Sequence, residues 1–320
     1  MSNRQDFIDA INHRTTQQHV PLWELHFHLW KKFSQDRFVS GKDFLALGEN
    51  EKQYAISSDA EIMVEIGEKL HFGGVSIPDM PWDCIYTLPQ EYRVQLVSEL
   101  KKRNPDFNVI AGAGGVLSMP SGSEGYEEFC YRLFDEPEQI DEKCETMFHN
   151  SLKVIDSLID AGIDGFYIPA DVADNRAPFF NGEQLERWYY PYLKKTVAYM
   201  KQKGKFAILH TDGNINTLLD NLLATGIDGL QAIDPVAGMD IVKVHEAWKG
   251  KACVCGNLDC GLMLNGTPDA VYEAAVQLLR SCKDGGDFIM GNSNAVAYET
   301  PVENYQAMIR AWEDYSSYNH

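Results

Sequence analysis

The chain alternates between short apolar runs and longer segments in which apolar residues recur with helical spacing. Apolar runs of this length, bounded by Gly or polar residues, are typical of buried strands in a parallel sheet. The runs are Val20–His26, Gly73–Ile77, Asn108–Gly112, Gly165–Ala170, Phe206–Leu209, Gly229–Ile233, Ala252–Cys255 and Phe288–Met290. Segments with helical spacing include Asp135–Ala161, Gly182–Lys203, Ile215–Thr225, Asp240–Trp248, Thr267–Asp284 and Thr300–Tyr315. Strands that alternate with helices predict an α/β protein.

Eight such units predict a (β/α)8 TIM barrel. An open doubly wound sheet is the competing arrangement, but no Gly-x-Gly-x-x-Gly follows a first strand, and the Gly-rich stretch 111–115 lacks the phosphate-binding spacing. No linker or low-complexity tract divides the chain, so a single domain over residues 1–320 is expected, with residues 1–19 as a helical extension. Segments 33–66 and 79–103 are expected to form an irregular insertion followed by a helical region.

Composition and charge restrict the partners. The chain has 28 Lys and Arg against 47 Asp and Glu, a formal net charge of −19, which disfavours nucleic acid and anionic membranes as partners. No long apolar segment suggests a leader or a membrane span, so a cytoplasmic protein is expected. The seven cysteines show no disulfide-framework spacing, which agrees with a reducing compartment. Cys253 and Cys255 are expected to be buried on one face of a strand.

Polar residues gather where the predicted strands end, which is where TIM barrels carry their chemistry. His210 and Asp212 follow the run 206–209 and share a face if the strand continues, which suggests a metal or proton-transfer site. Asp79, Asp171 and Asp174 also follow strands. Asp171 and Asp174 have an alternative interpretation as loop or cap residues, and Asp234 and Asp259 are better explained as caps.

A second cluster lies in Glu24-Leu25-His26-Phe27-His28. Alternation places Glu24, His26 and His28 on one face if the strand extends that far. Glutamate and histidine are both zinc ligands, so these residues and His210 are candidates for one metal site. The alternative is that single histidines only form hydrogen bonds in the barrel mouth.

The order of several short motifs resembles the uroporphyrinogen decarboxylase superfamily. The matching segments are Ile208–Asn214, Gly226–Pro235, Gly238–Asp240, Gly256–Asp259, Gly266–Pro268, Met290–Asn294 and Thr300–Asn304. The resemblance implies a (β/α)8 barrel and one of two activities. One branch decarboxylates uroporphyrinogen without a cofactor, and the other contains zinc-dependent methyltransferases that use a corrinoid carried by a partner protein.

Departures from the family patterns favour the methyltransferase branch. The Arg-rich motif of decarboxylases is replaced by residues 22–28, which contain no arginine, and Gly291-Asn292-Ser293 stands in place of their Gly-His-Gly. Asp79 does resemble the decarboxylase acid. The thiol-methylating members hold zinc with His-x-Cys and a distant Cys, whereas this chain has Asp212 after His210 and Asn292 near the later position. An oxygen-rich site is less suited to a soft thiolate.

The resemblance therefore implies a methyltransferase that moves a methyl group from a small methylated substrate, such as a methyl ether, to the corrinoid (cobalamin) of a partner protein. Zn²⁺ is the expected metal, with His210 and Glu24 as preferred ligands and His26, His28 and Asp212 as further candidates. Asp171 and Asp174 would orient or protonate the substrate. Two alternatives stay open: a decarboxylase with Asp79 as its acid, and a non-catalytic ligand-binding barrel. A homodimer is a further expectation.

Overall fold

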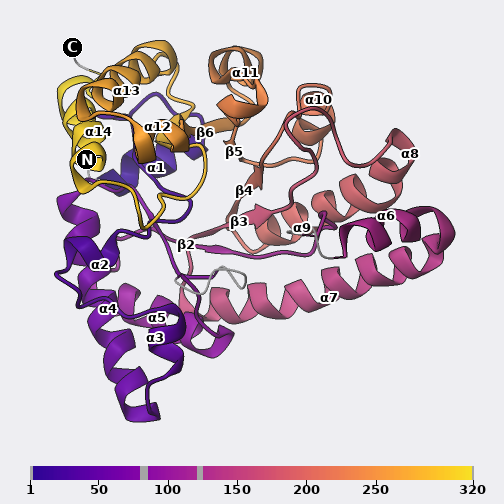
Figure 1. The fold of residues 1–320 in the computed structure, drawn as a ribbon, viewed down its shortest axis with the longest axis horizontal. Helices are drawn as coiled ribbons and strands as arrows, with labels where there is room; N and C mark the ends of the chain where they lie inside the picture. The colour runs from indigo at the N-terminus through magenta and orange to yellow at the C-terminus, as the bar shows by residue number, and fades with distance from the viewer. Residues whose placement is uncertain (1–2, 80–85, 121–124, 319–320) are drawn as a thin grey trace.

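A computed structural model describes residues 3–79, 86–120 and 125–318, and it shows a curled sheet of parallel strands surrounded by helices (Figure 1). The seven strands pair in chain order, each parallel to the next. They are β1 (Val75–Ser76), β2 (Val109–Gly112), β3 (Gly165–Pro169), β4 (Phe206–Thr211), β5 (Gly229–Ala232), β6 (Cys253–Leu258) and β7 (Phe288–Asn292). The predicted barrel-like α/β architecture is confirmed.

The predicted first strand, Val20–His26, is not a regular strand. Leu22 forms single parallel bridges to Phe72, just before β1, and to Met290 in β7, so this segment lies between the two edge strands of the sheet. Trp23 N–H donates to Met290 O, and Gly73 N–H donates to Leu22 O. The ladder stays short in part because Pro21 has no backbone N–H to donate.

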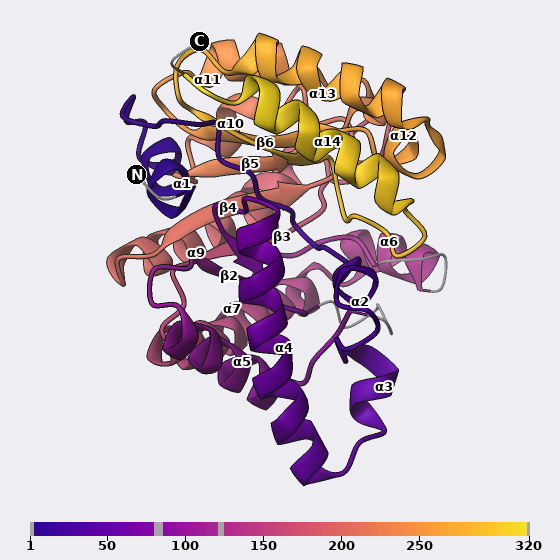
Figure 2. The same cartoon turned by 90° about the vertical axis from the view of Figure 1, so that its left-hand side faces the viewer.

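Helices connect the strands and cover the outside of the sheet. They are α1 (Asn3–Ile11), α2 (Trp30–Phe33), α3 (Gly41–Leu45), α4 (Glu49–Lys69), α5 (Gln90–Arg103), α6 (Tyr126–Asp135), α7 (Pro137–Ala161), α8 (Gly182–Gln184), α9 (Tyr190–Gln202), α10 (Leu219–Leu223), α11 (Ile241–Trp248), α12 (Cys260–Asn265), α13 (Pro268–Cys282) and α14 (Val302–Tyr315). A π-helical turn, Leu185–Tyr189, joins α8 to α9, and Pro235–Ala237 form a 3-10 turn. Figure 2 shows α13 and α14 packed side by side. No helix in the described ranges is long and apolar enough to cross a membrane.

The predicted irregular insertion over residues 33–66 is wrong for most of its length. Three helices, α2, α3 and α4, occupy or overlap this part of the chain, and α4 alone has 21 residues. Within 79–103 the predicted helical region is α5, and residues 80–85 lie outside the described residues. The buried face of α4 includes an acid and several small residues. The helical spacing of its apolar positions is therefore hard to recognise in the sequence.

Inward-pointing side chains of alternate strand positions fill the barrel. This inner cluster contains Trp23, Leu25, Ile110, Tyr167, Ile208, Cys253, Cys255 and Ile289. Phe7, Ala10 and Ile11 of α1 belong to the same cluster, and the Phe7 ring lies 6.3 Å from Trp23 and 5.6 Å from Phe206. Because Phe206 begins β4, α1 closes the amino-terminal end of the barrel. The prediction that Cys253 and Cys255 are buried together is confirmed.

Asp59 is a buried acid on α4 and provides a test of stability. Its Oδ1 accepts the Val39 N–H, while burial raises the pKa of its carboxyl to about 8. A raised folded-state pKa favours the protonated form, so the stability of the folded state falls as pH rises from about 4 toward 8. We expect Asp59→Asn to increase the free energy of unfolding at pH 8 by about 2 kcal/mol. The gain comes from removing a buried ionisable group, and the cost of burying the amide offsets part of it. Urea unfolding at pH 8 and pH 5 checks this, and a gain that does not shrink at pH 5 would contradict it.

A candidate metal centre at the carboxyl end of the barrel

A cavity of about 240 Å³, called the first cavity below, opens where β3 and β4 end. Its lining comes from the ends of both strands, the loops that follow them, the segments after β2 and β7, and the segment that precedes α2. The lining residues are Leu25, His26, Ser118, Met119, Tyr167, Pro169, Asp171, His210, Asp212 and Asn294. This is the end of the sheet at which TIM-barrel enzymes bind their substrates.

Three of these residues form a cluster with the composition of a metal site. His210 Nε2 lies 3.8 Å from Asp171 Oδ1 and 3.9 Å from Asp212 Oδ2, and one ligand atom of each residue lies within 4.8 Å of the others. The prediction that His210 and Asp212 share a face is confirmed. We call Asp171, His210 and Asp212 the His–Asp cluster.

Gln231 of β5 determines which nitrogen of His210 faces the two carboxylates. The Gln231 amide nitrogen donates to the carbonyl oxygens of Asn292 (3.1 Å) and Ser293 (3.3 Å), so Oε1 is the atom turned toward His210. His210 Nδ1 lies 2.5 Å from that oxygen and must carry the proton. The lone pair of the neutral ring is then on Nε2, between Asp171 and Asp212, which is the tautomer that binds a metal.

The two carboxylates are held by different partners. Asp171 Oδ1 accepts the Asp212 backbone N–H at 3.0 Å, and Asp212 Oδ2 accepts from Asn294 Nδ2 at 2.5 Å. Burial raises the pKa of Asp212 to about 6; the charge of His210 opposes this effect and that of Asp171 adds to it. A cation placed between the two carboxylates would offset the repulsion that Asp171 exerts on ionised Asp212. The donor set therefore fits a divalent metal ion, with one nitrogen and two carboxylate ligands.

His26 belongs to a second network behind the cavity wall. Its Nε2 lies 3.1 Å from Asp79 Oδ1 and 2.6 Å from the Tyr167 hydroxyl, which itself donates to Asp79 Oδ1 at 2.5 Å. The other Asp79 oxygen accepts the Gly112 N–H and lies 3.4 Å from Arg93 Nη2. Burial acts to raise the Asp79 pKa, but the His26 hydrogen bond and the Arg93 charge hold it below its ordinary value. Asp79 is thus ionised, and both of its carboxylate oxygens have partners. It is linked to the first cavity through His26 and Tyr167, which line that cavity.

The structure does not bring Glu24, His28 or Asp174 to the His–Asp cluster. Trp23 and Leu25 take the inward positions, so Glu24 points outward and accepts from the Tyr305 hydroxyl of α14 (3.0 Å) and the Asn292 N–H (2.9 Å). Burial raises the pKa of Glu24 to about 8. The expectation that Glu24 and His26 share a face was therefore wrong: the segment is not a regular strand, and His26 lines the first cavity whereas Glu24 does not.

His28 and Asp174 have separate surroundings. His28 lines a different cavity, where its ring lies 4.8 Å from that of Tyr86. Asp174 is exposed and accepts the backbone N–H groups of Arg176 and Ala177 at 2.7 and 2.9 Å, which is the loop role left open from the sequence.

Two other strand-end acids cap helical turns, as expected. Asp234 accepts the Val236 N–H, and Asp259 accepts the Leu262 N–H at the start of α12. Within the segment after β7, Asn294 rather than Asn292 reaches the cluster. Sequence reasoning missed Gln231, although an amide at an inward position of a buried strand is a usable signal.

Replacing Gln231 tests the orientation of His210. In Gln231→Leu the Nδ1 proton loses its acceptor, so Nε2 is no longer held as the free lone pair. We expect zinc affinity to fall about 10- to 100-fold, the usual effect of removing such a partner. Competition with a chromophoric chelator measures the affinity, and Gln53→Leu, at an exposed position of α4, serves as the matched control. Equal zinc affinity in Gln231→Leu and the wild type would contradict the assigned tautomer.

Several known proteins are similar to this chain in sequence. Methylcobamide:CoM methyltransferase MtbA of Methanosarcina acetivorans is 31% identical over 138 residues, covering 42% of this chain and 38% of that protein. MtaA of Methanosarcina barkeri, another methylcobamide:CoM methyltransferase, is 21% identical over 224 residues, covering 69% and 62%. A uroporphyrinogen decarboxylase of Anaeromyxobacter dehalogenans is 24% identical over 214 residues, covering 66% and 59%. The matches thus span less than two thirds of these relatives' own lengths.

The fold agrees with these matches. A methyltransferase from Methanosarcina mazei superposes with a TM-score of 0.73 at 15% identity, covering 98% of this chain and 99% of that one. The sequence pattern of the family described as Uroporphyrinogen decarboxylase (URO-D) matches residues 89–315, which include β2 to β7 and the whole His–Asp cluster. The chain belongs to the uroporphyrinogen decarboxylase family.

Proposed function

We propose that this protein is a metal-dependent methyltransferase that transfers the methyl group of a small O-methylated donor to the corrinoid of a partner protein. The observation that carries the proposal is the His–Asp cluster in the first cavity, with His210 Nε2 directed at two carboxylates. The corrinoid methyltransferases among the relatives support the reaction class. Asp171, His210 and Asp212 replace the broader ligand set expected from the sequence.

Zinc is the metal that we propose for the cluster. Three protein ligands with a position left for another group are the pattern of catalytic zinc sites. Bound there, zinc would supply a Lewis acid for the oxygen that loses its methyl group, without requiring a proton donor of matched pKa. Asp171 is 48% exposed and Asp212 34% exposed on their side chains, so the cluster is open to a donor from the cavity.

The other walls of the first cavity would position the donor. Leu25, Met119 and Pro169 offer apolar surface, while the Tyr167 hydroxyl is held by Asp79 and His26. Tyr167 thus lines the cavity, where it would flank the substrate, whereas Trp23 is buried inside the barrel. A donor would place its methyl-bearing oxygen at the His–Asp cluster and its apolar part against the opposite wall.

The kinds of residue that line the first cavity argue against two other classes of substrate. Among the described residues that line it there is no Lys or Arg, so a substrate with many carboxylates, such as uroporphyrinogen, has no cation to meet. No described cysteine lines it either, so the thiolate-rich zinc site of the thiol-methylating members is replaced by oxygen ligands. Both features favour a neutral methyl ether.

The corrinoid would arrive on a separate protein that docks over the carboxyl end of the barrel, where the first cavity opens. Wild-type protein loaded with zinc, a methyl ether and cob(I)alamin should produce methylcobalamin, followed by its absorbance. Removal of metal with a chelator should stop the reaction, and added zinc should restore it. Metal-independent formation of coproporphyrinogen from uroporphyrinogen, with no methyl transfer from any ether tested, would overturn the proposal in favour of a decarboxylase.

A further inference from the structure

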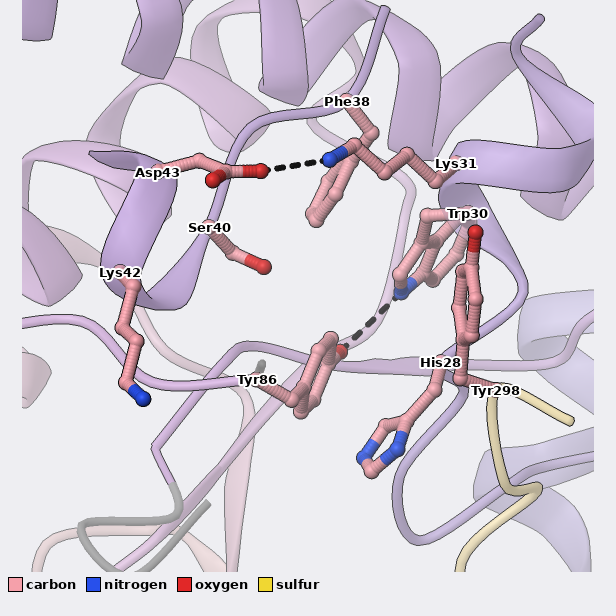
Figure 3. Close-up of a pocket in the computed structure, with 9 residues that line it drawn as sticks. All are labelled: His28, Trp30, Lys31, Phe38, Ser40, Lys42, Asp43, Tyr86 and Tyr298. Atoms are coloured by element: carbon pink, nitrogen blue, oxygen red, sulfur yellow. Dashed lines mark hydrogen bonds and ion pairs between the residues drawn. The ribbon is translucent and has the colours of Figure 1, made fainter. Parts of the chain in front are cut away.

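A second cavity, of about 260 Å³, lies beside the first and has different walls (Figure 3). Its lining comes from α2, α3, the segment between them, and the residues His28, Tyr86 and Tyr298. No member of the His–Asp cluster contributes to it. His26, which lines the first cavity, lies 5.8 Å from the Tyr86 ring of the second, so these two rings stand between the cavities.

Aromatic rings form most of the wall. Trp30 and Phe38 are stacked, with ring centres 5.9 Å apart and an angle of 26° between their planes. Trp30 Nε1 donates to the Tyr86 hydroxyl at 3.1 Å, and that hydroxyl donates to the Ser76 carbonyl at 2.8 Å. The polar atoms of both rings are therefore used within the wall, and the rings present carbon surfaces. Such walls fit a flat apolar group.

The charges at the edge favour an anion. Lys31 Nζ pairs with Asp43 Oδ2 at 2.6 Å, so these two charges compensate each other. Lys42 is exposed, and its ammonium group forms no hydrogen bond or ion pair within the described part of the chain. Figure 3 shows Lys42 across the cavity from Lys31, and the Ser40 hydroxyl directed into the space between Phe38 and Tyr86. Among the described residues that line this cavity, Lys31, Lys42 and Asp43 leave one positive charge in excess, in a chain of net charge −19, whereas the first cavity is lined by two carboxylates.

We propose that the second cavity binds a planar aromatic monocarboxylate. Its ring would lie against Trp30, Phe38 and Tyr86, and its carboxylate would face Lys42. An aromatic ring gains stacking contacts on these walls, and the positive charge of Lys42 selects one carboxylate over a neutral or cationic substituent. This proposal does not depend on the methyltransferase activity, because neither metal nor corrinoid takes part in the binding.

Isothermal titration calorimetry with benzoate tests the proposal, with benzamide as a neutral probe of the same shape. We expect one benzoate per chain, bound about tenfold more tightly than benzamide, as one charge-assisted contact at an open edge allows. Lys42→Met should weaken benzoate binding about tenfold and leave benzamide unchanged, and Lys42→Arg should keep the preference. Lys102→Met, which removes an exposed lysine of α5, is the matched control.

A carboxylate could also bind to a metal ion in the first cavity, so the titration is repeated with metal-free His210→Ala. Benzoate binding that persists in this variant supports the second cavity. The proposal is overturned if benzoate gives no saturable heat, if benzoate and benzamide bind equally, if Lys42→Met changes neither, or if binding disappears in His210→Ala.

Discussion

His210→Ala should remove the bound metal and reduce methyl transfer by about a thousandfold or more. His210 is the nitrogen ligand of the proposed site, and the two carboxylates left behind would have to hold a divalent ion without it. A Lewis acid at a leaving oxygen contributes several kcal/mol to the barrier, and each 1.36 kcal/mol corresponds to a factor of about ten. Metal content is measured by mass spectrometry on protein never exposed to a chelator, and methyl transfer by methylcobalamin formation.

Two controls separate this effect from a loss of folding. His149→Ala removes an exposed histidine of α7 that pairs with Glu145, and its metal content should equal that of the wild type. Thermal unfolding of His210→Ala shows whether the variant is folded, and His210→Gln provides a less drastic change. A folded His210→Ala protein that keeps one equivalent of zinc and most of its activity would disprove the ligand assignment.

Asp79→Asn should lower the free energy of unfolding at pH 7 by about 3 kcal/mol. The Asp79 side chain is 3% exposed and Arg93 11% exposed, so the substitution leaves a nearly buried guanidinium without its anion. Breaking one partner of a buried ion pair typically costs about 3–5 kcal/mol. The exposed pair of Arg37 and Glu65 offers a matched acid-to-amide control, because Glu65→Gln should change stability by less than about 0.5 kcal/mol.

The pH dependence of this loss follows from the direction of the Asp79 pKa. The folded-state pKa lies below its ordinary value, so ionised Asp79 contributes stability above a pH of about 4 and loses it as pH falls through the folded-state pKa. The difference in unfolding free energy between wild type and Asp79→Asn should therefore shrink as pH decreases from 7 toward 3. Urea unfolding across this range measures it, and a difference that grows toward acid pH would mean that Asp79 is protonated in the folded protein.

The arrangement of the barrel could be predicted because buried strands and the ends of helices have strong local signals. The run before His210 has the apolar length of a parallel strand, and Thr267-Pro268 begins a helix with a cap and a proline in its first turn. Residues 20–26 have the same apolar composition as a strand but form only single bridges to two different neighbours. Apolar composition alone does not show whether a segment pairs with its neighbours along its length or only at single positions.

The site was predictable only where one strand determines the geometry. His210 and Asp212 share a face because they lie two positions apart at the end of one strand, and the structure places them together. Asp171 joins them from the end of the neighbouring strand, and Gln231 orients His210 from the strand on the other side, so both depend on sheet register. Glu24 was placed on the wrong face because strand alternation was assumed for a segment that is not a regular strand, in which Trp23 lies inside the barrel and His26 lines the first cavity.

The central claim is that the His–Asp cluster binds the catalytic metal. Anomalous diffraction at the zinc absorption edge, on crystals of protein purified without chelator, tests it most directly. The account predicts one peak among His210 Nε2 and the carboxylates of Asp171 and Asp212. A zinc peak at Glu24 or His28, or none near His210 in protein that contains one equivalent of zinc, would contradict it.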